Sequence, residues 1–90
     1  MAREAEQIAQ DHSAMLGSVS VITSVIATHN RGSDATDTDF GHDLTHDEKK
    51  ARVARSNGYI VHMKTLDDWG SEDMTAIDAA ITAATNFIAA

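Results

Sequence analysis

The first third of the chain repeats its core-type residues at alternating steps of three and four. These residues are Ala5, Ile8, His12, Met15, Val19, Ile22, Ile26 and His29. Such steps keep side chains on one face of an α-helix, and here they run through about four heptads without a slip. The pattern predicts one long helix from about Arg3 to His29.

A helix of this length limits the shape that the protein can take. At about 1.5 Å per residue it would be about 40 Å long. A compact chain of 90 residues has a radius of gyration of only about 12 Å, and a globule about 30 Å across cannot enclose such a helix. We therefore expect an elongated or oligomeric protein.

The β-branched run from Val19 to Ile26 allows a second interpretation. Its residues alternate well enough to form a strand. We favour the helix because the heptad phase continues through the run, but the sequence alone leaves the strand open. The half of the helix from Ser13 to His29 carries no charge when its histidine is neutral, which indicates neighbours on several sides.

A polar loop is predicted after the first helix. Asn30 to Gly32 is typical of a helix end, and Ser33 to Asp43 is rich in Asp, Thr and Gly. Thr45 and Glu48 then have the spacing of a capping box, in which each side chain binds the backbone N–H of the other residue. This box predicts the start of a second helix at His46.

The middle helix is predicted to be short, from His46 to Ser56. The pair Asn57-Gly58 is typical of a left-handed helix end. The apolar residues from Tyr59 to Met63 fit a strand, an extended connector or the first turn of another helix, and their pattern does not choose among these.

A second apolar helix is predicted near the end of the chain. Ser71 is a suitable N-cap, and Glu72 and Asp73 would complement the dipole of the first turn. The three-four spacing then continues through Met74, Ile77, Ile81, Ala84 and Ile88. The alanine-rich flank of this helix would allow close approach of the uncharged half of the first helix.

These elements predict an all-α fold in one domain, residues 1–90, with a long N-terminal helix, a short middle helix and a C-terminal helix. We expect the first and third helices to form an oligomerising helical seam. Its predicted interface residues are Ile8, Met15, Val19, Ile22, Ile26, Met74, Ile77, Ile81 and Ile88.

The amino-acid composition limits the kinds of binding partner and site that the protein can have. The formal net charge is −7, and there is no cysteine, so thiolate metal sites and cysteine nucleophiles are excluded. An acidic surface repels phosphate backbones, so we predict no nucleic-acid partner although one basic patch exists. That patch consists of Lys49, Lys50, Arg52 and Arg55. We also expect a soluble chain, in the cytoplasm or a virion, with no secretion signal and no membrane partner.

Two weak metal-binding patterns occur around the polar loop. Asp37, Asp39, Asp43 and Glu48 match part of an EF-hand calcium loop, but a histidine, His42, stands where that loop requires glycine. His42 and His46 have the four-residue spacing of zinc-binding histidines on a helix, but the accompanying glutamate is absent. The candidate ligands are therefore His42, His46, Asp37 and Asp39, and the favoured interpretation is a solvated loop without metal or cofactor.

No catalytic residue is assigned, because the chain has no phosphate-binding loop and no nucleophile elbow. We expect a structural protein and not an enzyme: a small subunit of a larger symmetric assembly, with virion or phage components as the favoured class. Its partners would be copies of itself and other subunits. The alternative is an acidic inhibitor or antitoxin-like protein that binds a basic surface. A metal-binding module is a further alternative.

Overall fold

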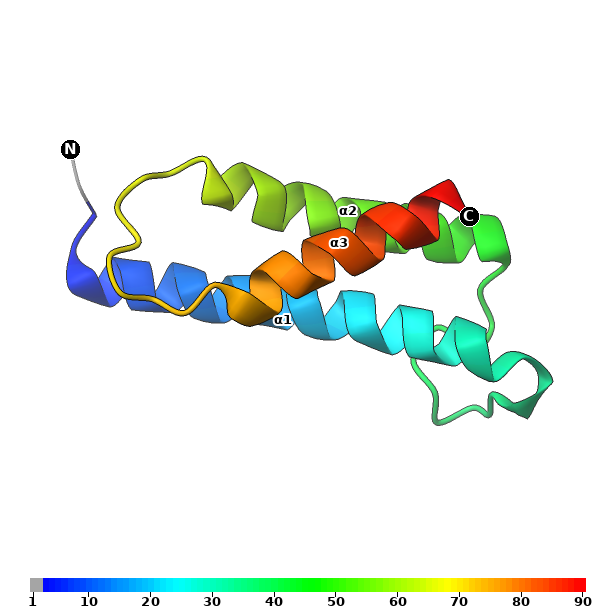
Figure 1. Ribbon diagram of the computed structural model, residues 1–90. Coiled ribbons are helices and arrows are strands. Elements are labelled where there is room, and N and C mark those ends of the chain that lie inside the picture. Colours follow the sequence, from blue (N-terminus) through cyan, green and yellow to red (C-terminus); the bar gives the residue numbers. More distant parts are fainter. Residues whose placement is uncertain (1–2) are drawn as a thin grey trace.

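The computed structural model describes residues 3–90 as a bundle of three α-helices. Helix α1 spans Ala5–Arg31, α2 spans His46–Lys64 and α3 spans Thr75–Ala89, and a short 3-10 helix, η1, covers Gly32–Asp34. Figure 1 shows α1 and α2 antiparallel, with α3 laid across them. No strand occurs between residues 3 and 90, so the predicted all-α fold is confirmed for that part.

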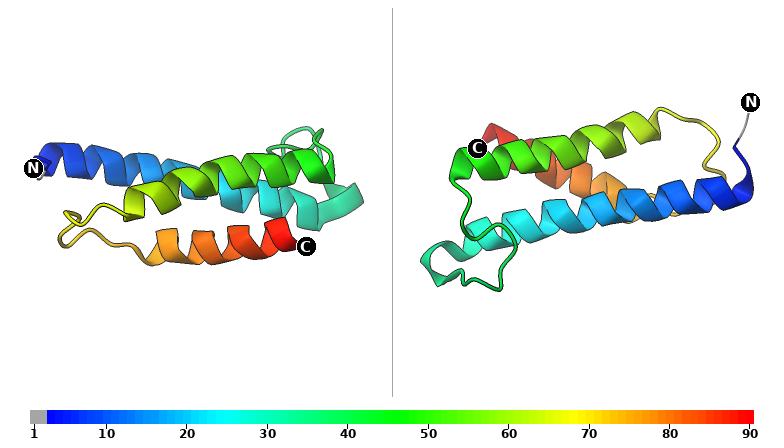
Figure 2. Two further views of the ribbon diagram at one scale, coloured as in Figure 1. Left: turned by 90° about the horizontal axis from the view of Figure 1, so that it is seen from above. Right: turned by 180° about the vertical axis from the view of Figure 1, so that it is seen from behind.

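The bundle is elongated, which is one of the two outcomes that the length of α1 predicted. Its principal extents are 48 × 25 × 18 Å, and its radius of gyration is 14.4 Å. Both views of Figure 2 show α1 running along the long axis while α2 and α3 lie beside it. A single chain thus accommodates the long helix without enclosing it on all sides.

Helix α1 follows the sequence prediction closely. The run from Val19 to Ile26 is helical, which settles the choice between helix and strand. The helix begins at Ala5 and continues two residues beyond His29 to Arg31. It ends at Gly32, whose φ of 57° favours glycine, and the N–H of Gly32 donates to the carbonyl of His29.

The predicted start of α2 is also confirmed. The Thr45 hydroxyl accepts a hydrogen bond from the Glu48 N–H at 3.1 Å, and the Glu48 carboxylate accepts one from the Thr45 N–H at 2.9 Å. Both halves of the capping box are therefore present.

The predicted end of α2 is wrong. The helix continues through Asn57 and Gly58 to Lys64, and Gly58 does not adopt a positive φ. Ile60 is fully buried, so the turns after the glycine extend the apolar stripe that Val53 begins. Burial of this stripe outweighs the cost of a glycine inside a helix, about 1 kcal/mol relative to alanine.

The predicted start of α3 is also wrong. The helix begins at Thr75 and not just after Ser71, and the Thr75 N–H donates to the Asp73 carboxylate at 2.9 Å. The segment before it is held in a turn by its neighbours. The Glu72 N–H donates to the carbonyl of Trp69 at 3.2 Å, and a ring nitrogen of His12 lies 2.7 Å from the carbonyl oxygen of Asp73.

The core lies where the three helices meet. Its fully buried large side chains come from all of them: Met15, Ile22 and Val25 on α1, Val53 and Ile60 on α2, and Ile77 on α3. Of the alanine flank predicted on α3, Ala80 is buried, Ala83 is partly buried and Ala76 is exposed. Ala84, on the apolar stripe of the same helix, is also buried, and small side chains at these positions allow the helices to approach closely.

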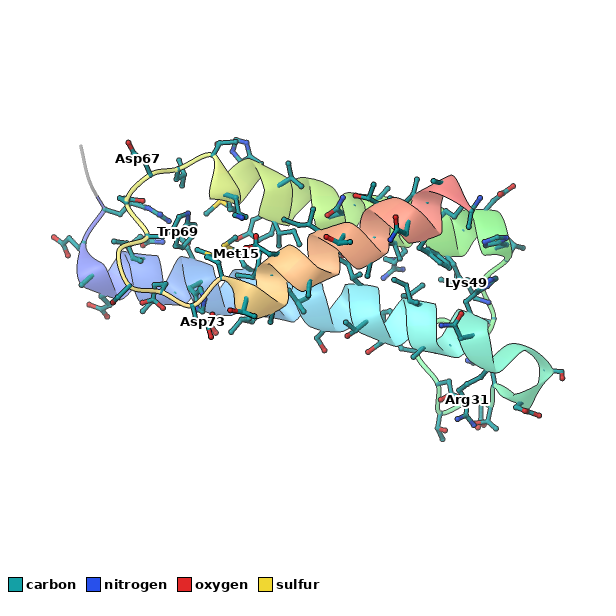
Figure 3. All side chains as sticks on the ribbon, in the orientation of Figure 1. Met15, Arg31, Lys49, Asp67, Trp69 and Asp73 are labelled. Carbon is teal, nitrogen blue, oxygen red and sulfur yellow. The ribbon has the colours of Figure 1, made fainter. Side chains whose placement is uncertain are left out.

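Trp69 closes the core at the end where α1 begins. Its indole N–H donates to the carbonyl of Met63 at 3.1 Å, and the guanidinium of Arg3 stacks 4.2 Å from its ring centroid. Figure 3 shows Trp69 and Met15 on the inner side of the bundle, whereas Asp67 points away from it. The Arg3 side chain and N–H also bind Asp68, and these bonds hold the pKa of the Asp68 carboxyl well below its usual range.

Candidate functional site

Three of the nine predicted interface residues lie inside the chain's own core, and the other six lie at its edge. Met15, Ile22 and Ile77 are fully buried. The other six pack against this core while remaining partly exposed: Ile8, Val19, Ile26, Met74, Ile81 and Ile88. The helical seam is therefore covered by helices of the same chain, because α2 is longer than predicted and α3 lies across α1. The interface role of the six partly exposed residues stays a prediction.

The opposite side of α1 is exposed and uncharged. We define the α1 outer face as Ser13, Leu16, Gly17, Ser20, Ser24 and Ala27. In the rear view of Figure 2, no helix passes in front of α1. Leu16 is 39% exposed, and Ser24 is the one member that is partly buried. Most of these residues are small, so the face is smooth, and its only side-chain polar groups are the hydroxyls of three serines.

A shallow surface pocket adjoins the α1 outer face. It measures about 210 Å³ and is lined by Ser20, Val21, Ser24 and Phe40. Phe40 comes from the loop between η1 and α2 and is 46% exposed, and the Arg52 guanidinium lies 5.7 Å from its ring centroid. The walls are mainly apolar, so the pocket suits an aliphatic side chain.

Hydrogen bonds within the loop hold Phe40 in place. The Asp39 carboxylate accepts from the Thr36 N–H at 2.8 Å and pairs with the Arg31 guanidinium at 3.1 Å. These contacts, led by the Thr36 N–H, lower the pKa of Asp39. Figure 3 shows Arg31 beside this loop. These contacts join the loop to the end of α1 through protein groups alone.

The four candidate metal ligands do not converge. Asp39 is engaged by Arg31 and Thr36, and Asp37 and His42 are exposed on the loop. His46 packs against His29 and not beside His42. Across residues 3–90, no three His, Asp or Glu side chains are grouped as they would be to hold a metal ion.

The four residues of the predicted basic patch lie on α2, which carries five of the chain's seven Lys and Arg residues. They are not directed at one ligand. Lys50 donates to the backbone carbonyl of Ala90, and Arg52 lies over Phe40. Arg55 is exposed, and Lys49 is near the histidine cluster described next.

Two histidines and a phenylalanine meet at the other end of the bundle from Trp69. The rings of His29 and His46 stack with centroids 4.3 Å apart, and His29 meets Phe87 edge to face at 5.1 Å. Burial lowers the pKa of His29, and His46, Lys49 and Lys50 lower it further. The fold therefore favours the neutral ring of His29.

This cluster predicts a loss of stability in mild acid. Because the pKa of His29 is lower in the folded protein than its ordinary 6.5, the unfolded chain binds the proton more readily, and the stability present above pH 6.5 declines as the pH falls. The lowered carboxylate pKa values act only below about pH 4. Urea unfolding at pH 7.5 and 5.5 should show the decline in the wild type.

The His29→Phe variant should lose this dependence, because it keeps an aromatic ring against Phe87 without a titrating group. His42→Asn, which changes an exposed loop histidine, is the control and should behave as the wild type does. Equal stability of the wild type at the two pH values would contradict the assignment.

Comparison with known proteins returned no match, whether to a family model, to a curated protein or to a solved structure. Within residues 3–90, none of the helices has the length and apolar character needed to cross a membrane. Inferences about function therefore rest on the surface geometry.

Sequence reasoning missed the residues that form the exposed surface, above all Leu16, Gly17 and Phe40. One signal for them was present, since the uncharged half of α1 predicted neighbours on several sides. The position of Phe40 beside α1 had no such signal, because the fold of the loop depends on the pairing of Arg31 with Asp39.

Proposed function

We propose that this protein is a small structural subunit that packs into a larger symmetric assembly and has no catalytic role. The observation that carries the proposal is the α1 outer face, an exposed helix surface without an ionisable side chain on a chain of net charge −7. Interfaces between subunits are poor in charged residues at their centre. An uncharged strip of this length is the kind of surface that another subunit covers.

Within this class we favour a component of a virion or phage particle, such as a capsid, connector or tail accessory protein. Such particles repeat one small subunit through symmetric contacts. A narrow rod, 48 Å long and 18 Å in its smallest extent, can pack side by side with its neighbours. The charged loops at its two ends would remain at the rim of such contacts.

The proposal is tested by measuring whether the protein is part of a large particle in its native source. We expect it to sediment with a large particle in gentle lysates, at a copy number that is a multiple of a particle symmetry. Recovery of the native protein only as a free small species would contradict the assembly role.

A second candidate is an acidic inhibitor or antitoxin-like protein that binds a basic surface. It is favoured by Asp34, Asp37, Asp43 and Asp67, which are exposed and increase the negative charge of the two segments between the α-helices. The salt dependence of binding distinguishes the inhibitor function from the assembly function. Binding of a basic target should weaken strongly between about 0.05 and 0.5 M salt, whereas packing through an uncharged face should persist.

A further inference from the structure

Helix α1 contains a glycine whose presence the chain's own packing does not explain. Gly17 lies in the middle of the exposed side of α1, its φ is not positive, and a β-carbon placed there would meet no atom within 4 Å. Glycine in a helix interior costs about 1 kcal/mol relative to alanine. A glycine at this point would allow close approach of a second helix from outside the chain.

The α1 outer face also has a complementary projection and hollow. Leu16 projects from the face, and the pocket lined by Ser20, Val21, Ser24 and Phe40 is the hollow. At about 100° per residue, Leu16 and Ser24 lie about 40° to either side of Ser20, and each is four residues from it. A two-fold axis through Ser20 would therefore place Leu16 of one copy over Ser24 and the pocket of the other.

Charge favours the same arrangement. Two copies of a chain with net charge −7 repel each other at most surfaces, but the α1 outer face brings no ionisable groups together. The exposed side of α2, by contrast, carries Arg52 and Arg55 and would set like charges together in a symmetric pair.

We infer that two copies of this chain pair antiparallel through the α1 outer face, with Leu16 of each copy in the pocket beside Phe40 of the other. This inference rests on the proposed assembly function and names its first contact. The contact covers little more than one helix face, which puts it at the low end of specific interfaces. The pair should therefore be in measurable exchange with single chains.

Sedimentation across a concentration series tests the pairing. The wild type should shift from one chain to two as concentration rises. Gly17→Arg should weaken dimerisation by at least about tenfold, because its long side chain occupies the place of the second helix. Gly58→Arg is the matched control: Gly58 is also within a helix with no atom within 4 Å of a β-carbon, and it lies on α2. It should pair as the wild type does.

Disulfide trapping tests the axis, since the chain has no cysteine of its own. Ser20→Cys should give a linked dimer on oxidation, because the two Ser20 positions face each other. Ser13→Cys lies on the same exposed face, but its two copies would be about 21 Å apart in the antiparallel pair, too far for a disulfide. It should remain unlinked, whereas a parallel pair would link both variants.

Several results would overturn the inference. In sedimentation, the wild type would stay a single chain at every concentration, or the Gly17→Arg variant would pair normally. In disulfide trapping, Ser20→Cys and Ser13→Cys would give the same yield of linked dimer. Each leaves the assembly proposal standing if the native protein still sediments with a particle. Absence of both the pair and the particle would remove both proposals, so the two failures are distinguishable.

Discussion

Replacing Ile22 with Asp is expected to unfold the protein. Ile22 is fully buried at the centre of α1, where it packs with side chains of the other two helices. Losing its apolar burial costs roughly 1.5 to 3 kcal/mol, and an unpaired carboxylate in the core adds several more. The sum approaches the roughly 5 to 13 kcal/mol that stabilises a domain of this size. Circular dichroism should show little helix at neutral pH.

Two further variants control for the added charge. Ile81→Asp places the carboxylate at a partly buried position of α3 and should lower the melting temperature without abolishing the fold. Ala79→Asp places it on the exposed side of the same helix and should have little effect. A folded Ile22→Asp variant with near-normal stability would show that the core is not as described.

Truncating Trp69 to Ala should destabilise the protein by about 3 to 5 kcal/mol, the usual cost of removing a buried tryptophan. The side chain is only 9% exposed and ties the loop between α2 and α3 to the start of α1. Its removal opens a cavity, leaves the Met63 carbonyl without its donor and takes the stacking partner from Arg3. Urea unfolding followed by circular dichroism measures the loss.

Tyr59→Ala is the matched control for Trp69→Ala. Tyr59 is an aromatic residue on α2 that is 37% exposed, so its loss should cost much less. Trp69→Phe should fall between the two, because it restores apolar contact but not the hydrogen bond to Met63. If both alanine variants lost the same stability, the closing role of Trp69 would be contradicted.

Local signals in the sequence predicted the elements that do not depend on distant contacts. The heptad steps predicted α1 through Val19–Ile26, because they record which face of the helix is buried. The capping box of Thr45 and Glu48 predicted the start of α2, because both partners lie within one turn. The all-α fold followed from these patterns.

The errors have a common cause in tertiary contacts. Asn57-Gly58 has the local signature of a helix end, yet burial of Ile60 against the other helices carries α2 beyond it. Ser71 has the local signature of an N-cap, yet the turn at Trp69 delays α3 to Thr75. At Ile60 the burial is a long-range contact, and before Thr75 the long-range contact is that of the His12 ring with the Asp73 carbonyl; each outweighs a local preference worth about 1 kcal/mol.

By itself, the sequence determined that the chain is helical and that α1 is long, because helix periodicity and rise per residue are local properties. It left open whether the protein is elongated or oligomeric, and the fold of the single chain is elongated. The tertiary structure decided what covers the apolar stripe of α1. Its own α2 and α3 cover that stripe, since packing within a chain requires no loss of the translational freedom that association removes. The opposite side of α1 is left exposed, and it carries no charge from Ser13 to Ala27.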